Sequence, residues 1–167
     1  PLTIADGDAA AGTITLVIQA MGHSTKAIVA MPVGGAIRDV AGPLGAPTHL
    51  MDKGFAVGVG GGVGTAVVHP IAQALHRSGV RVISIIGGRN RPLVIYHDEL
   101  SRLGEVRVCT DDGSWGRKGL VTDELKDLCA AEKPDIIYAV GPVPMMAAVC
   151  ATSKPLAIPT VVSLNPV

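Results

Sequence analysis

Glycine dominates the stretch of the chain that is best suited to hold a ligand. Residues 55–74 read FAVGVGGGVGTAVVHPIAQA, an apolar run that enters a glycine cluster and continues as a helical pattern. A sharp turn from a buried strand into a helix exposes backbone N–H groups, which bind phosphate at a helix N-terminus. The spacing departs from the dinucleotide fingerprint G-x-G-x-x-G, because Val63 and Thr65 occupy the third-glycine positions of its two possible registers. A purely structural glycine turn therefore stays open beside our hypothesis of phosphate binding by Gly61, Gly62, Val63, Gly64 and Thr65.

The pattern that follows this turn predicts an α/β fold. Apolar strand-like runs alternate with helical patterns from residue 55 onward. Such alternation is typical of a five-stranded, doubly wound parallel sheet with right-handed crossovers. The expected strands are 55–60, 80–86, 105–109, 135–140 and 158–163, and the expected helices are 64–78, 94–103, 119–131 and 143–151.

Ligand-suited residues follow the expected strands. In a doubly wound sheet the ligand lies beyond the carboxyl ends of the strands, where the strand order reverses. Arg89 follows the second strand, Asp111 and Asp112 follow the third, and the stretch 141–145 follows the fourth. Phosphate is bound well by arginine, and ribose hydroxyls by carboxylates. Each loop also has an ordinary explanation as a turn or a solvated loop, but four such loops on one edge favour a nucleotide site.

Composition argues against several classes of function. Fourteen basic and fourteen acidic residues balance, no basic run stands out, and aromatic residues make up 2% of the chain, so we expect neither nucleic acid nor a membrane surface as a partner. No uninterrupted apolar segment approaches the roughly 18 residues of a membrane span. The three cysteines lack metal or redox spacing and are odd in number, which fits a reducing cytoplasm. His69 and His76 have no third ligand, so packing or solvent explains them better than a metal.

Residues 1–50 do not show this alternation of strands and long helices. Residues 13–20 and 36–41 are expected to be strands, and Ser24 and Thr25 can cap a short helix that ends near Met31. Strands without long amphipathic helices suggest part of an antiparallel β-barrel. We therefore expect two domains, residues 1–50 and residues 51–167.

Taken together, the motifs resemble a known family. In chain order they are GGGVGTAVVHPIAQAL, IIGGRN, TDDGSWGRKGLVTD, YAVGPVPMM and VVSLNPV. Their order resembles that of ferredoxin reductase-like flavoproteins over nearly the whole chain. The branch most similar is the small subunit of NADH-dependent ferredoxin:NADP oxidoreductase, also called sulfide dehydrogenase, and the electron-transfer subunit of dihydroorotate dehydrogenase is its near relative.

The resemblance implies three cofactors. Members of the family join an FAD-binding barrel to an NAD(P)-binding α/β domain and end in a [2Fe-2S] segment. The flavin motif Arg-x-Pro-Leu-Thr/Ser-Ile is matched from Pro1 through Leu2 and Thr3, without the Arg, and a second flavin element, Gly-x-x-Thr, is matched by Gly22, Ser24 and Thr25. The cluster cysteines of the family would lie past Val167, and both ends of the chain look cut from a longer protein.

One departure bears on the nicotinamide side. Many relatives carry Cys-Gly-Pro beside the nicotinamide ring, as the dihydroorotate branch does, whereas this chain has Val140-Gly141-Pro142. The difference favours the ferredoxin:NADP branch and removes a candidate catalytic thiol. The resemblance places Gly61 to Thr65 at the pyrophosphate, Asp111 and Asp112 at the ribose, and Gly141, Pro142 and Met145 at the nicotinamide.

The expected activity is electron transfer. In the intact protein NAD(P)H would reduce FAD, which would pass electrons to a [2Fe-2S] cluster and to a large redox subunit, with ferredoxin as electron partner. The 167-residue chain alone is expected to be inactive, and no catalytic side chain is assigned because hydride passes between cofactors. A dihydroorotate dehydrogenase subunit and a non-catalytic nucleotide-binding module are the alternatives.

Overall fold

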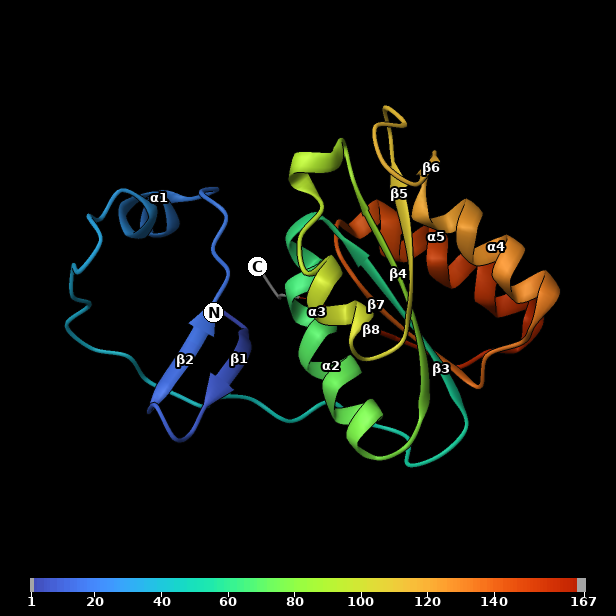
Figure 1. The fold of residues 1–167 in the computed structure, drawn as a ribbon, viewed down its shortest axis with the longest axis horizontal. Coiled ribbons are helices and arrows are strands. Elements are labelled where there is room, and N and C mark those ends of the chain that lie inside the picture. Colours follow the sequence, from blue (N-terminus) through green and yellow to red (C-terminus); the bar gives the residue numbers. More distant parts are fainter. Residues whose placement is uncertain (1, 165–167) are drawn as a thin grey trace.

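Residues 2–164, which the computed structural model describes, form a small antiparallel hairpin and a larger α/β domain (Figure 1). The hairpin pairs β1 (Ile4–Asp8) with β2 (Thr13–Leu16), and the short helix α1 (His23–Val29) follows it. The chain then runs to residue 54 without a further helix or strand.

The α/β domain is built on a six-stranded sheet in the order β6-β5-β4-β3-β7-β8, with every pair of neighbours parallel. The central strand β3 is buried on both faces, as is typical of a parallel sheet covered by helices on both sides. The strands are β3 (Phe55–Gly61), β4 (Arg81–Gly88), β5 (Glu105–Thr110), β6 (Arg117–Lys118), β7 (Ile136–Val140) and β8 (Thr160–Val162).

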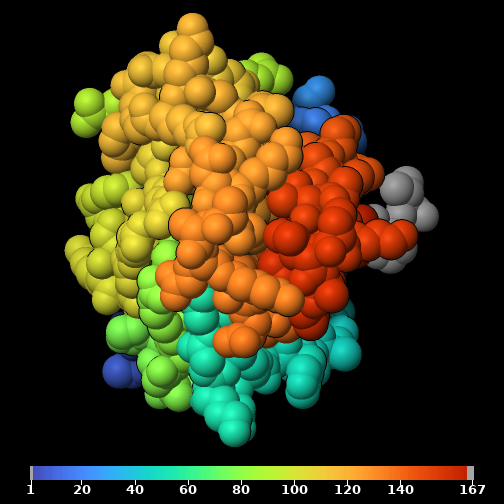
Figure 2. Space-filling view, turned by 90° about the vertical axis from the view of Figure 1, so that its right-hand side faces the viewer, coloured from blue at the N-terminus to red at the C-terminus, as the bar shows by residue number. Residues whose placement is uncertain are grey.

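Two helices cover each face of this sheet. Figure 1 shows α2 (Thr65–Arg77) and α3 (His97–Ser101) on one side of it and α4 (Val121–Ala131) and α5 (Val143–Ser153) on the other. Two separate cores result: Leu125 and Val149 belong to the core on the α4 and α5 side, and Leu75 and Leu100 belong to the other. Figure 2 views the molecule onto α4 and α5, which lie side by side on its surface. Three short 3₁₀ segments complete the fold: η1 (Gly62–Gly64), η2 (Arg91–Leu93) and η3 (Lys154–Leu156).

The predicted parallel doubly wound fold is confirmed, with one strand more than predicted. The additional strand, β6, has two residues, both exposed and charged, so the sequence contains no apolar run that would predict it. It forms because Cys109 of β5 pairs with Arg117. The predicted helix over 94–103 is also shorter than expected and occupies only His97–Ser101.

The chain before the α/β domain, residues 2–54, departs further from the prediction. The strand predicted over 36–41 is absent, and Ile37 and Val40 there are exposed. A strand needs a hydrogen-bonded neighbour, and no described segment lies beside this one. Conversely β1 was not predicted, since its sequence IADGD is poor in strand-forming residues. Only two antiparallel strands therefore represent the predicted barrel, and the division at residue 51 stays a prediction.

Tyr138 hydrogen-bonds to the connecting segment, residues 30–54, which runs from α1 to β3. This side chain is fully buried on β7, and its hydroxyl donates to the carbonyl of His49 and accepts the N–H of Met51, both at 3.3 Å. Burial raises the pKa of the Tyr138 phenol above its usual value, so the hydroxyl keeps its proton at neutral pH.

None of the three cysteines forms a disulfide within the described residues. Cys109 and Cys129 are buried, Cys150 is half-buried, and all three are free thiols. Burial raises the pKa of Cys109 to about 11, which keeps its thiol protonated and unreactive near neutral pH.

Candidate functional site

The carboxyl ends of four neighbouring strands meet along one edge of the six-stranded sheet. In the parallel register Gly61 of β3 pairs with Gly87 of β4, Gly88 pairs with Thr110 of β5, and Gly60 pairs with Val140 of β7. Because neighbouring strands lie about 4.8 Å apart, the loops that follow them fall within roughly 15 Å. The register therefore brings the four predicted ligand loops together.

The strand order reverses between β3 and β7. From β3 the chain proceeds through β4 to β5 on one side, and then returns through α4 to β7 on the other. The turn after β3 leads into α2 and the turn after β7 leads into α5, which lie on opposite faces of the sheet (Figure 1). In open α/β sheets the crevice at such a reversal is where ligands bind.

The glycine turn at this crevice is built by two different constraints. Gly62 has φ +56°, a left-handed conformation that favours glycine. Gly64 is buried, and a Cβ there would overlap the carbonyl oxygen of Val140 and lie 2.6 Å from its carbonyl carbon. Gly64 thus lets the N-terminus of α2 approach β7, which is a structural role. It is compatible with a ligand role for the turn, because Val63 stays exposed and Gly61 and Gly62 are only half-buried.

The start of α5 borders the crevice from the other side. A Cβ on Gly61 would lie 2.5 Å from Sδ of Met145 and 3.2 Å from Cδ of Pro142. A Cβ on Gly141 would lie 2.7 Å from Cε of Met145. The Met145 side chain therefore lies over two facing glycines, so the structure brings Gly141, Pro142 and Met145 directly beside the glycine turn.

Arg89, Asp111 and Asp112 form the third part of the edge. The N–H of Asp111 donates to the carbonyl of Gly88 and the N–H of Asp112 donates to the carbonyl of Arg89, both at 3.2 Å. These bonds continue the pairing of β4 with β5 beyond the strand ends. One cation and two carboxylates consequently extend from adjoining backbone, and all three side chains are exposed.

Asp112 is held by a local turn. The backbone N–H of Ser114 donates to Oδ1 of Asp112 at 2.9 Å, and the hydrogen bonds from Ser114 hold the pKa of Asp112 below its usual value. The hydroxyl of Ser114 also accepts the N–H of Arg91 at 2.9 Å, which ties this loop to the one after β4. A carboxylate at this position is ionised at neutral pH and suits hydroxyl donors.

Trp115 is a member of this edge that sequence reasoning did not identify. Its backbone is bonded twice to the Thr110 hydroxyl, at 2.8 and 3.1 Å. The ring lies 4.6 Å from the imidazole of His97, and the guanidinium of Arg91 lies 5.4 Å from the ring centroid. Nearby, Oδ1 of Asn90 is buried without a hydrogen-bond partner among the described residues. The available signal was that the chain's single tryptophan directly follows the DDGS turn.

Apart from Pro1, the residues predicted to contact FAD lie in the hairpin part, residues 2–29, which contains β1, β2 and α1. Pro1 is outside the described residues, and Leu2, Thr3 and Ser24 are exposed. Oγ1 of Thr25 accepts the N–H groups of Met21 at 3.1 Å and Gly22 at 3.0 Å, so two amides at the start of α1 already have partners. Figure 1 shows α1 apart from the sheet.

Other features of the surface do not coincide with the predicted site. An apolar groove of about 490 Å³ is lined by residues of α4 and α5 together with Pro155 and Leu156, and by none of the predicted residues. A smaller hollow of about 250 Å³ is lined by Val140, Thr48 and Val67, close to the glycine crevice. We place the site by the convergence of loops rather than by the size of a hollow, because the larger groove carries only one charged side chain, Lys126.

Among residues 2–164, no three His, Cys, Asp or Glu residues come together as a possible metal site. None of the helices there is long and apolar enough to cross a membrane.

Comparison with known families assigns the α/β domain. The family model of the oxidoreductase NAD-binding domain matches residues 59–151, which run from the end of β3 into α5 and include the glycine turn. The chain belongs to this family.

Two similar proteins are named as electron transfer subunits of dihydroorotate dehydrogenase B or as a homolog of one. The chain is 39% identical over 167 residues to the dihydroorotate dehydrogenase B (NAD(+)) electron transfer subunit homolog of Thermotoga maritima, covering all of this chain and 59% of the relative. It is 35% identical over 153 residues to the corresponding electron transfer subunit of Fusobacterium nucleatum, covering 89% of this chain and 59% of that one. The chain therefore spans about 60% of the length of these relatives.

Solved structures give the same picture. The NADH-dependent reduced ferredoxin-NADP oxidoreductase superposes with a TM-score of 0.93 at 36% identity, covering all of this chain and 60% of that one. A flavohemoglobin from Malassezia yamatoensis, at 17% identity and a TM-score of 0.76, shares the fold. The resemblance to ferredoxin reductase-like flavoproteins is confirmed.

The close approach of α2 to β7 generates a prediction. Gly64→Ala should lower the free energy of unfolding by about 1–3 kcal/mol, because the added methyl group meets backbone atoms of Val140 that cannot move separately. Urea unfolding followed by circular dichroism measures the change. Val63→Ala, in the same turn but exposed, is the control and should stay within about 0.5 kcal/mol of the unmodified chain. Equal effects of the two substitutions would show that the turn is not packed as described.

Proposed function

We propose that the chain binds a nicotinamide dinucleotide along the carboxyl edge of its sheet and forms the nucleotide-binding part of an electron-transfer flavoprotein subunit. One observation carries the proposal: the glycine turn lies at the strand-order reversal, between a loop pair with Arg89 and two aspartates and the start of α5. Membership in the oxidoreductase NAD-binding domain family supports it.

The order of the strands assigns each part of the dinucleotide to one of the loops. The pyrophosphate would lie at Gly61 to Thr65, where the N–H groups of the turn that precede Thr65 and the dipole of the 13-residue helix α2 favour an anion; the N–H of Thr65 itself bonds to the carbonyl of Gly62. The adenosine ribose would lie over β4 and β5, where Asp111 and Asp112 can accept hydrogen bonds from its hydroxyls. The nicotinamide would lie at the β7 side, against Gly141, Pro142 and Met145.

The chemistry belongs to the cofactors. When bound, a reduced nicotinamide supplies a hydride to a flavin, which can release the two electrons singly to a [2Fe-2S] cluster. The residues of this chain hold and orient the nucleotide, and Pro142 and Met145 give its nicotinamide end an apolar border. No side chain needs to act as an acid or a base, so we assign no catalytic residue.

The flavin would be held by the hairpin part. Leu2 and Thr3 precede β1, while Gly22, Ser24 and Thr25 form the start of α1. Because Thr25 already accepts the N–H groups of Met21 and Gly22, a phosphate of FAD would meet the remaining N–H groups of the first turn. The three cysteines lie on β5, α4 and α5 and form no common cluster site within the described residues.

Two kinds of complex fit these features. In the first, the subunit serves an NADH-dependent ferredoxin:NADP oxidoreductase, with a large redox subunit and ferredoxin as partners, as the similarity to that structure supports. In the second, it serves a dihydroorotate dehydrogenase, as the names of two relatives support. Val140 at the position of the cysteine that the dihydroorotate branch carries favours the first.

Anaerobic reduction tests the proposed activity. The full-length product of the gene that encodes this chain should bind flavin, and NADH should bleach the flavin absorbance near 450 nm. Bleaching by NADH followed by electron delivery to ferredoxin supports the first complex, and delivery only with a dihydroorotate dehydrogenase catalytic subunit supports the second. A product that binds NADH but no flavin would contradict an electron-transfer role.

Nucleotide preference gives a further prediction. We expect NADH to bind more tightly than NADPH, because the carboxylates of Asp111 and Asp112 repel a 2′-phosphate; two unit charges about 4 Å apart interact by about 4 kcal/mol at an effective dielectric of 20. Calorimetric titration with both nucleotides measures it. Arg89→Ala should leave NADH binding nearly unchanged, and Arg102→Ala, exposed at the end of α3, is the matched control. Tighter NADPH binding that Arg89→Ala abolishes would show that the arginine, and not the aspartates, decides the preference.

A further inference from the structure

A buried histidine lies one helical turn after the glycine turn. His69 on α2 is only 3% exposed, although imidazole is polar and the sequence offers it no metal partner. Its position is four residues beyond Thr65, about 6 Å along the helix axis. A buried polar group of this kind needs hydrogen-bond partners.

The partners of His69 come from two different parts of the molecule. Nδ1 lies 3.0 Å from the carbonyl oxygen of Ala5, on β1, and Ala5 is 1% exposed. Nε2 lies 3.3 Å from Nε2 of Gln73, one turn further along α2. A carbonyl can only accept, so Nδ1 carries the hydrogen, and the neutral ring can then accept from the Gln73 amide through Nε2.

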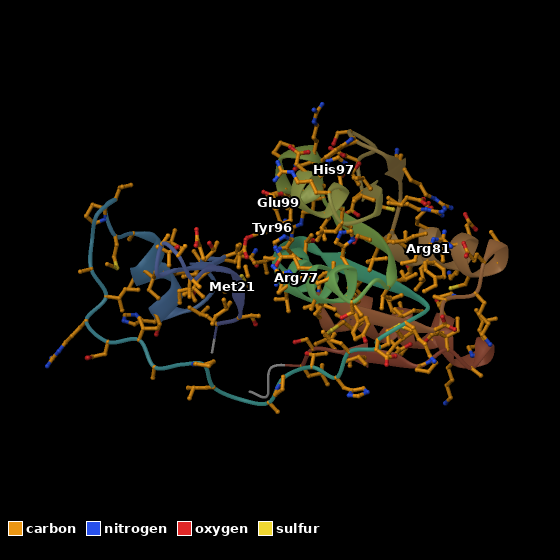
Figure 3. All side chains as sticks on the ribbon, turned by 60° about the horizontal axis from the view of Figure 1, so that its bottom comes forward. Met21, Arg77, Arg81, Tyr96, His97 and Glu99 are labelled. Carbon is orange, nitrogen blue, oxygen red and sulfur yellow. The ribbon has the colours of Figure 1, made fainter. Side chains whose placement is uncertain are left out.

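An aromatic contact supports this arrangement. The ring of Tyr96 lies 4.7 Å from the imidazole, and the backbone of Tyr96 has φ +61°, an uncommon left-handed conformation for such a residue. Figure 3 shows Tyr96 on the side of the α/β domain that faces the hairpin part. The imidazole is thus held on three sides, which fixes the direction of its Nδ1–H.

The bond to Ala5 has no counterpart elsewhere in the described chain. Among residues 2–164 it is the one hydrogen bond that joins residues 2–48 to residues 55–164, while Tyr138 holds only the connecting segment. No salt bridge joins the same two stretches. The orientation of β1 against α2 therefore depends on one imidazole and on the apolar contacts around it.

We propose that His69 is a positioning residue that sets the distance between the bound nicotinamide and the flavin. This inference rests on the proposed function, which places the nucleotide at the start of α2 and the flavin in the part of the chain that contains β1. His69 touches neither cofactor. It joins the helix that begins at the nucleotide turn to the strand that directly follows Leu2 and Thr3, so its loss should change the geometry of hydride transfer without changing nucleotide affinity.

Three substitutions separate positioning from packing. His69→Leu keeps volume but removes the donor and leaves the Ala5 carbonyl buried without a partner. His69→Asn places an amide nitrogen where Nδ1 lies, and His69→Gln places it where Nε2 lies, away from Ala5. His76→Leu is the control, because His76 is exposed on the same helix.

Stopped-flow reduction of the flavin by NADH in the full-length gene product is the test. His69→Leu and His69→Gln should slow flavin reduction at saturating NADH by about tenfold or more, because a misplacement near 1 Å can cost up to about a hundredfold. The dissociation constant for NADH should stay within about twofold. His69→Asn should recover most of the rate, and His76→Leu should match the unmodified protein.

The outcomes decide between the alternatives. An unchanged rate in His69→Leu, or equal rates in the Asn and Gln variants, would overturn the positioning role. If His69→Leu fails to fold, the comparison of Asn with Gln alone decides the question. If the unmodified protein shows no flavin reduction by NADH, the proposed function fails and the inference falls with it, an outcome that the unmodified protein distinguishes from the variants.

Discussion

The pairing of β3 with β4 on one side and with β7 on the other is the constraint on which the rest of the molecule depends. It makes β3 the central strand, buries that strand on both faces, and places the reversal of strand order beside Gly61. The turn that follows must then pass close to the backbone of Val140, which only glycine at position 64 permits. The same pairing aligns the ends of β4 and β7, and the pairing of β4 with β5 adds the end of β5, so one backbone arrangement produces both the core and the crevice.

Sequence patterns predicted the parts of the fold that carry their own signal. Runs such as 55–61 are apolar throughout because both faces of the strand are buried, and the glycine cluster marks the turn into α2. The edge elements were missed or wrongly predicted, since pairing rather than composition decides them. Arg117 and Lys118 form a strand because β5 lies beside them, whereas residues 36–41 have suitable side chains but no neighbour.

The candidate site, too, contains features that the sequence predicts and features that depend on tertiary contacts. The loops at Gly61, Arg89, Asp111 and Gly141 follow predicted strands, so their convergence could be derived from topology. The bonding of His69 to Ala5 could not, because it joins residues 64 positions apart and depends on how the hairpin lies against α2. Sequence reasoning assigned His69 to packing or solvent; the structure shows packing together with a specific hydrogen bond.

Backbone amide spectra of the 167-residue chain, recorded by NMR during titration with NADH, test the central claim most directly. If the nucleotide lies along the carboxyl edge, the largest shifts will occur at residues 61–65, 111–114 and 141–145, and residues at the opposite edge, such as Gly54 and Asp135, will stay unchanged. Shifts that instead cluster on α4 and α5 around the groove at Lys126 would contradict the account.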